Sequence, residues 1–310
     1  MLIGPFLAFF LLCLLYGSSY AVATFGFRKF SGETLAFLRM SYSFCTNFFI
    51  LVVLLYYNPS LMIKIKKDLS IKKYFVFKAI FSGVINSGFP HSLISISQRT
   101  LSSSFINILQ SIAPFFSLLF SAIYWKKVIT LRKLFPHFLA IFGTILVSIP
   151  TFSSNSSSSS APSFFDLLLS LIAIVSFGYG AVYMKVYLSD LDLITNVFLQ
   201  SIGSSLYTFI AAIFQDQHFF PSIFKASFKD MIIPIILGVL FTTGTSFLSV
   251  YVCNRLGPVT LLMANYGQIV VGVFEGVLLL HEWDGFTRQS KFISLSGILI
   301  LISSLFLGLS

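Results

Sequence analysis

Of the 310 residues, 56% are hydrophobic and only 10% are charged, and the mean hydropathy is +0.93. These values exclude an ordinary soluble domain and indicate an integral membrane protein. The long apolar runs predict helices, because the strands of a membrane barrel would alternate polar and apolar residues. The net charge of +10 comes from short basic clusters between apolar runs. That pattern favours contact with anionic membrane lipid over nucleic-acid binding.

Ten apolar segments are long enough to be spanning helices. In chain order they cover residues 3–25, 33–57, 74–96, 101–125, 134–151, 164–184, 193–214, 231–253, 258–280 and 292–309. The first has no basic region before it, so we expect a spanning helix and not a signal peptide. The serine-rich stretch 152–163 predicts a flexible linker between a first repeat, 1–151, and a second, 164–310.

Short sequence matches relate the two halves. Gly17 in YGSSYAV aligns with Gly178, and at the same offset FLR, ending at Arg39, falls on FLQ, ending at Gln200. Further matches pair Gly88 with Gly244, Gln98 with Asn254, Arg99 with Arg255, and FGTILVSI with SGILILIS. Because five is an odd number, the second copy of a five-helix unit must be inserted upside down. The predicted fold is therefore an all-α integral membrane protein of ten transmembrane helices in two inverted five-helix repeats.

An even number of spans places both termini on the same side of the membrane. The basic residues are more numerous on that side, which predicts cytoplasmic termini in a multi-pass protein. The membrane itself, plasma, inner or organellar, stays open. The linker then faces the exoplasmic side, where the sequon at Asn155 would be open to glycosylation in a secretory-pathway host.

Two stretches resemble the EamA-type family of the drug/metabolite transporter superfamily. They are LLYGSSYAVATFGFRKFSGETLAFLRMSYSF in the first half and NRLGPVTLLMANYGQIVVGVFEGVLLLHEWDGFTRQSKFISLSGILILIS in the second. The resemblance spans nearly the whole chain and implies a carrier that works by alternating access, with a central pathway lined by both halves. Two turns depart from the family pattern, where His281 precedes Glu282 and where Lys126 replaces an expected glutamate.

Charged residues inside apolar helices mark candidate sites, because each is costly in hydrocarbon. Arg39 and Glu275 are expected at a similar depth, roughly 8–9 Å below the exoplasmic surface at 1.5 Å per residue. We predict that Arg39 pairs with Glu275 or with a substrate carboxylate; snorkelling to the headgroups stays an alternative. Glu275 is also a candidate proton carrier. The neighbouring Gly272 and Gly276 suggest a face for close helix packing.

Amide side chains at helical spacing form a second candidate set. Asn107 and Gln110 share one helix, and Asn265 and Gln268 fall near their counterparts in the second repeat. Amides suit a metabolite site, although bonds between helices are an equal alternative. Pro114 is expected to bend its helix and free a backbone carbonyl. The predicted substrate-binding residues are Arg39, Asn107, Gln110, Asn265, Gln268, Glu275, Tyr20 and Tyr179.

No catalytic residues, metal site or cofactor are predicted, because the sequence contains no nucleophile motif, phosphate loop or metal-ligand spacing. The function that the sequence favours is secondary transport of a small polar or amphipathic metabolite by alternating access. The alternatives are a membrane structural or assembly protein and an intramembrane enzyme. The expected partners are the small-molecule substrate and membrane lipid, with no nucleic acid. Coupling to a proton or counter-substrate, and a homodimer, stay open.

Overall fold

The computed structural model describes residues 3–58, 73–97, 109–154, 164–279 and 287–309, with residues 60, 65, 101 and 106 besides. Every regular element in these ranges is helical, and none of them forms a strand. The first half contains α1 (Ile3–Gly26), α2 (Gly32–Tyr57), α4 (Lys73–Gly83), the π-helical turn η1 (Val84–Gly88), α5 (Phe89–Ser97), α7 (Ala113–Trp125) and α8 (Leu131–Ser154).

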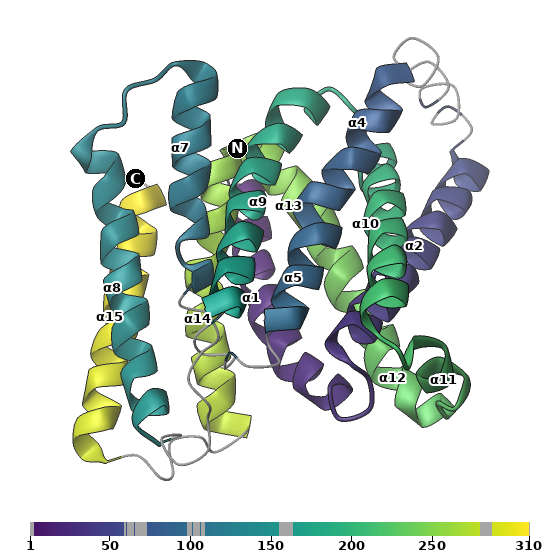
Figure 1. The fold of residues 1–310 in the computed structure, drawn as a ribbon. Helices are drawn as coiled ribbons and strands as arrows, with labels where there is room; N and C mark the ends of the chain where they lie inside the picture. Colours follow the sequence, from purple (N-terminus) through teal and green to yellow (C-terminus); the bar gives the residue numbers. More distant parts are fainter. Residues whose placement is uncertain are drawn as a thin grey trace.

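The second half contains α9 (Phe164–Leu188), α10 (Leu193–Gln215), the short helix α11 (Phe219–Phe224), α12 (Phe228–Ile236), the π-helical turn η2 (Leu237–Thr242), α13 (Thr243–Leu256), α14 (Pro258–Leu279) and α15 (Arg288–Leu309). Both termini lie at one end of the bundle (Figure 1). We call it the terminal end, and we call the opposite end, where α11 lies, the distal end.

Seven helices in the described ranges are long and apolar enough to cross a membrane. They correspond to the first, second, fifth, sixth, seventh, eighth and tenth expected spans. The third expected span coincides with α4, η1 and α5, the ninth with α14, and the second half of the fourth with α7. Length and composition thus support a multi-pass helical membrane protein. Helix α11 was not expected from the sequence.

One boundary was predicted wrongly. Helix α8 runs to Ser154, three residues into the predicted linker 152–163. Residues 152–154 do not break the helix, because they include no proline and each keeps its backbone N–H. The rest of the linker, with Asn155, lies outside the described residues.

Local sequence explains where several helices begin. Ser31 caps α2 by accepting a bond from the backbone N–H of Thr34 at 3.1 Å. Asp192 caps α10 in the same way. Ser227 and Asp230 form a reciprocal capping box at the start of α12. Each cap satisfies backbone N–H groups that the first helical turn leaves without a partner.

The side-chain distribution reverses the pattern of a soluble protein. Large apolar side chains such as Phe49, Phe138 and Phe214 lie exposed on the perimeter. The interior holds many small polar side chains, including the fully buried Ser97, Ser111 and Thr144. Hydroxyls of this kind bond back to their own helix, as Thr144 does to the carbonyl of Ala140 at 2.9 Å. An apolar perimeter around a partly polar interior is suited to a lipid solvent.

Glycines allow the helices to cross at short range. A Cβ at Gly83 on α4 would lie 1.9 Å from the carbonyl oxygen of Gln200 on α10, and one at Gly203 would lie 1.9 Å from that of Ile80. Gly143 on α8 and Gly297 on α15 face each other, since a Cβ on either would lie within 2.9 Å of the other's carbonyl oxygen. Only residues without a Cβ permit these backbone contacts.

Two π-helical turns interrupt long helices, and side-chain hydroxyls satisfy carbonyls within them. In η2, Thr242 donates to the carbonyl of Leu237 at 2.8 Å and Thr243 donates to that of Gly238 at 3.0 Å. In η1, the carbonyl of Ile85 accepts from Ser176 of α9 at 2.6 Å. π-helical turns often occur at functional sites. Both turns contribute residues to the central cavity described next.

Candidate functional site

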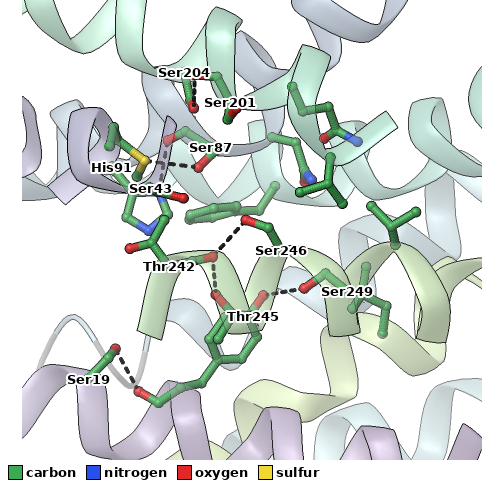
Figure 2. A pocket seen from close by; sticks show the side chains of 18 of the residues that line it. Ser19, Ser43, Ser87, His91, Ser201, Ser204, Thr242, Thr245, Ser246 and Ser249 are labelled. Carbon is green, nitrogen blue, oxygen red and sulfur yellow. Dashed lines mark hydrogen bonds between the residues drawn. The ribbon is translucent and has the colours of Figure 1, made fainter. Parts of the chain in front are cut away.

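A cavity of about 100 Å³ lies at the centre of the bundle, and helices of both halves line it. From the first half come Tyr16, Ser19, Arg39, Met40, Ser43, Asn86, Ser87, His91 and Gln110. From the second come Phe177, Met184, Val197, Gln200, Ser201, Ser204, Thr242, Thr245, Ser246, Ser249, Val250, Leu261, Leu262, Asn265 and Gln268. Figure 2 shows the hydroxyl groups of the labelled serines and threonines gathered around it.

Hydroxyls on α13 and α1 form two groups of hydrogen bonds at the cavity wall. Thr245 and Ser246 both donate to the carbonyl of Thr242, at 3.2 and 2.7 Å. One turn further along α13, Ser249 and the Tyr16 hydroxyl share a hydrogen bond of 3.0 Å that joins the two halves (Figure 2). These groups give the cavity wall donors and acceptors without charge.

Arg39 projects from α2 toward η2. Its Nε donates to the Thr242 hydroxyl at 2.5 Å, and this contact directs the guanidinium to the interior of the bundle and not to the headgroups. His91 lies beside it and bonds through Nδ1 to the carbonyl of Ser87 at 2.7 Å. Arg39, Met40 and His91 also line a second cavity of about 50 Å³, which reaches Gly32 and Ser95 at the distal end. They therefore separate the central cavity from the distal end.

The predicted pairing of Arg39 with Glu275 is wrong. Among the described residues the only ion pair is between Lys29 and Asp230. Glu275 instead accepts a hydrogen bond from Ser18 of α1 and does not line the central cavity. The cause is the close approach of α1 and α14, where a Cβ at Gly17 would lie 2.6 Å from Val271, one turn before Glu275. This part of α14 packs on α1, so depth alone did not bring the two charges together.

The predicted amide set is assembled as expected for three of its four members. Gln268 Nε2 donates to Gln110 Oε1 at 3.2 Å, and all of Gln110, Asn265 and Gln268 are buried at the cavity. Asn107 lies outside the described residues. The amides therefore bridge α14 to the segment before α7, as the alternative of bonds between helices predicts, and they also line the cavity; their contact with a metabolite stays a prediction.

Pro114 explains a further contact of Asn265. Proline has no N–H, so the carbonyl of Gln110, four residues earlier, loses its helical partner. Asn265 Nδ2 donates to this carbonyl at 3.2 Å, and α7 begins only at Ala113, after a turn at residues 111–112. The proline thus frees a backbone carbonyl inside the bundle, as predicted, and the second half of the chain satisfies it.

Asn265→Leu is expected to destabilise the protein, because a buried carbonyl without its donor costs about 1–3 kcal/mol. The unfolding temperature in detergent should fall by roughly 2–4 °C for each kcal/mol of lost stability. The matched control is the same substitution in a Pro114→Ala background, where the restored N–H of residue 114 can bond the Gln110 carbonyl. If the two substitutions add without coupling, the proline and the amide do not act on the same carbonyl.

One of the two predicted tyrosines, Tyr179, does not line the central cavity. Tyr179 is 42% exposed and packs against Phe120 and Tyr183, with ring centroids 5.5 and 6.0 Å apart. The glycines on either side of it pack on other helices, Gly178 against Phe116 of α7 and Gly180 against Asn86 of η1. The side chain of Tyr20 lies outside the described part of the structure. Tyr16, on the same helix, does line the cavity.

Several lining residues were missed from the sequence. Gln200 is aligned with Arg39 by the repeat but is not among the predicted site residues; it donates to Asn196 Oδ1 at 2.8 Å. Asn86 and the serines and threonines carry no signal of their own, because such residues are common in packed membrane helices. The close helix packing predicted for Gly272 and Gly276 is not found at Gly272, because nothing lies within 4 Å of a Cβ built there, and the surroundings of Gly276 lie outside the described part of the structure. No three His, Cys, Asp or Glu side chains in the described ranges form a metal-ligand group.

Comparison with known proteins agrees with this architecture. The model of the EamA-like transporter family matches residues 3–149, which agrees with the resemblance found in the first half of the sequence. One solved structure, described only as "Crystal structure of protein", shares 11% identity with this chain at a TM-score of 0.69. The match covers 98% of this chain and 96% of the solved one, and at this identity it shows the fold alone. No curated protein matches the chain.

Proposed function

We propose that this chain is a secondary carrier with ten spans in two inverted five-helix repeats, because residues 3–149 match the model of the EamA-like transporter family. In this proposal it moves a small polar metabolite by alternating access, driven by a gradient or by exchange. The central cavity is the observation that carries the proposal: a polar chamber lined by both halves, inside helices whose outer faces are apolar. A purely structural protein would have no need of such a chamber.

The helix crossings support the inverted repeat, since glycines matched in sequence occupy matched contacts. Gly17 packs α1 on α14, the first span on the ninth, whereas Gly178 packs α9 on α7, the sixth on the fourth. Gly143 and Gly297 lie against each other on the fifth and tenth spans. The π-helical turns η1 and η2 interrupt the third and eighth spans. A rotation that exchanges the halves would exchange each of these features.

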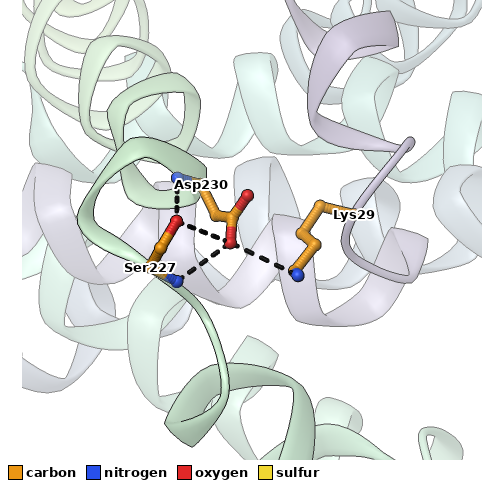
Figure 3. A network of polar contacts seen from close by, with 3 residues as sticks. All are labelled: Lys29, Ser227 and Asp230. Atoms are coloured by element: carbon orange, nitrogen blue, oxygen red, sulfur yellow. Dashed lines mark hydrogen bonds and ion pairs between the residues drawn. The ribbon is translucent and has the colours of Figure 1, made fainter.

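The distribution of basic residues gives the orientation of the proposed carrier in the membrane. Basic clusters are densest at the terminal end, so this end is cytoplasmic and the distal end exoplasmic. Polar contacts between the halves close the distal end. Lys29 and Asp230 form an ion pair at 3.3 Å (Figure 3), and Thr34 donates to Asp216 Oδ2 at 2.5 Å. The arrangement corresponds to a carrier that is closed on the exoplasmic side.

Hydrogen bonds lower the pKa of the Asp216 carboxyl at the closed distal end. Burial alone would raise its pKa, but bonds from Ser31, Thr34 and the backbone N–H of His218 outweigh that effect and lower the pKa below the ordinary 3.8. Asp216 therefore remains ionised near neutral pH and continues to accept bonds from the capping residue and first turn of α2.

The cavity chemistry favours a neutral or anionic polar solute. Within the described lining, Arg39 is the one permanently charged side chain and no carboxylate is present. Hydroxyls and amides supply the remaining donors and acceptors. The volume of about 100 Å³ is below the roughly 300–1,000 Å³ of drug-sized sites, so a small substrate, or opening of the cavity, is required.

Reconstitution tests the proposal directly. Purified protein in sealed liposomes should accumulate or exchange a labelled metabolite from a panel of neutral and anionic polar compounds. The panel is first ranked by thermal shift, since bound ligand raises the unfolding temperature. An intramembrane enzyme would convert the compound instead of moving it. If neither movement nor stabilisation occurs across the panel, the carrier assignment is wrong.

Breaking the closing ion pair should open the distal end. In a Cys45→Ala, Ser95→Cys background, Lys29→Glu places two negative charges together and should speed labelling by an impermeant thiol reagent. An exposed ion pair contributes up to about 1 kcal/mol, so roughly a fivefold change is expected. Arg28→Glu is the control, because Arg28 makes the same charge change but contacts the Phe25 ring. Equal labelling in both variants would show that the ion pair does not hold the end closed.

Glu275 is the proposed coupling site if the carrier is proton-driven. Its carboxylate accepts a bond from Ser18 where α1 and α14 meet, two helices that both line the cavity. Glu275→Gln keeps the shape and cannot exchange a proton. Uptake driven by a pH gradient should therefore be lost, while exchange at equal pH continues. A variant that still responds to the gradient would exclude this role.

A further inference from the structure

A cavity with basic residues in its wall lies away from the central cavity, at the terminal end. It has a volume of about 590 Å³ and lies among the α7–α8 turn, the α13–α14 turn and the end of α15. Lys127, Arg132 and Lys133 line it, and no carboxylate is among its described lining residues. These three cations form no ion pair with any described residue. An anion is therefore the group missing from this cavity.

The N-terminus of α8 also favours an anion in this cavity. Arg132 and Lys133 occupy the first turn of α8, which has no acidic residue. Cations are unfavourable there, because the helix N-terminus already carries partial positive charge and free N–H groups. The same features make this end of the helix a good anion site. At the inner wall, the hydroxyl of Ser121 is buried and has no hydrogen-bond partner in the described structure.

An apolar groove continues from the basic cavity. A second cavity, of about 400 Å³, shares Arg132, Pro136 and Leu307 with the first. The rest of its wall is apolar, and Phe135 and Phe138 on α8 are 59% and 58% exposed. A ligand that fits both cavities has an anionic head and a hydrocarbon tail. Neither a free phosphate nor an acidic peptide has that form.

The depth of this site agrees with a lipid headgroup. Tyr124 and Trp125 end α7 beside the cavity, and such aromatic residues gather at the membrane interface. We propose that these cavities form a binding site for one anionic phospholipid. Its phosphate contacts Lys127, Arg132 and Lys133, and its acyl chain lies along Phe135, Phe138 and Leu307.

A lipid bound in these cavities joins the two halves of the chain. The cavity floor contains His137 of α8 and is bounded by Met263 of α14, and His137 and Tyr266 of α14 share a hydrogen bond of 2.8 Å. On the other wall, Ser304 of α15 donates to the carbonyl of Pro136. A lipid held here contacts α8, α14 and α15 together, so it stabilises the packing of the first half on the second.

Thermal unfolding of the full chain in neutral detergent tests the site, with phosphatidylglycerol, phosphatidylcholine of the same chains and inorganic phosphate as probes. Phosphatidylglycerol alone should raise the unfolding temperature. Replacing the three cations with Gln should weaken its binding on the order of 100-fold, since each contributes about fivefold. The charge-matched control replaces Lys225, Lys229 and Arg288 at the distal end and should bind normally. Lys126→Gln, in the same turn but outside the cavity, should do the same.

A second measurement does not depend on the folding of the triple variant. A photoactivatable phosphatidylglycerol should crosslink wild-type protein within residues 118–138, 256–263 or 303–309. Crosslinks confined to other segments would overturn the proposal. So would equal stabilisation by inorganic phosphate, which means an ion site, or by phosphatidylcholine, which means an apolar groove. Equal weakening in the site and control triple variants would show attraction to net charge alone.

Discussion

Arg39→Met should reduce transport roughly 10- to 100-fold while the protein still folds. The guanidinium is the permanent charge of the described cavity lining, and it is held toward η2 by its bond to Thr242. A hydrogen bond to a charged group contributes about 1.5–3 kcal/mol, which corresponds to that range of rates when it is made to the substrate. The measurement is initial uptake into liposomes, with folding followed by thermal unfolding.

Two further variants separate charge from geometry. Arg39→Lys keeps the charge but loses the planar fork, so activity should be intermediate. Thr242→Val keeps the guanidinium and removes the hydroxyl that orients it, so the Michaelis constant should rise more than the maximal rate falls. Gln200→Leu, at the matched position of α10, is expected to have a smaller effect because no charge is lost. Normal transport by Arg39→Met would mean that Arg39 is only a structural residue.

Gly83→Ala should cause a clear loss of stability. The new Cβ would lie 1.9 Å from the backbone oxygen of Gln200, a distance that real Cβ atoms do not reach. The carbonyl cannot rotate away as a side chain could, so α4 and α10 must separate. Overpacking of this kind costs about 1–3 kcal/mol, or roughly 2–12 °C in unfolding temperature for a chain of this size.

The control for this prediction has the opposite sign. Gly272→Ala adds the same methyl group on α14, where nothing lies within 4 Å of the new Cβ. Alanine in a helix interior is more favourable than glycine by about 0.5–1 kcal/mol, so this variant should be unchanged or more stable. Gly203→Ala meets the carbonyl of Ile80 at the same crossing and should behave like Gly83→Ala. Equal behaviour of Gly83→Ala and Gly272→Ala would show that the crossing relaxes without cost.

The amide set and the central charge could be identified from residue type. Gln110, Asn265, Gln268 and Arg39 all line the cavity, because polar atoms within an apolar helix must find a polar surrounding. The hydroxyl residues escaped detection for the complementary reason. Thr245 and Ser249 can satisfy themselves on their own helix or on a neighbour, so their presence in a sequence does not show where they point.

The depth of a residue in the membrane and the helical period of the sequence did not show which side chains contact each other between helices. Arg39 and Glu275 were expected at one level, yet Arg39 bonds to Thr242 and Glu275 to Ser18. Tyr179 was expected in the cavity and lies on the perimeter. Each error is one of rotation about a helix axis. In a membrane protein that rotation depends on how neighbouring helices pack, and the order of apolar residues along one helix does not reveal it.

Composition and hydrophobic run length, read from the sequence, determined that this chain is a helical membrane protein with a resemblance to EamA-type transporters. Both properties are sums over residues. Each apolar side chain contributes its own free energy of transfer into lipid, whichever residues it contacts in the folded protein. Only the tertiary structure decided which polar groups meet. Helix rotations and crossings are determined by backbone contacts at glycines such as Gly83 and Gly143, and by breaks such as the turn before Pro114. These contacts join residues far apart in the chain, and lipid, being as apolar as leucine, offers no solvent contrast that would reveal them in a single segment.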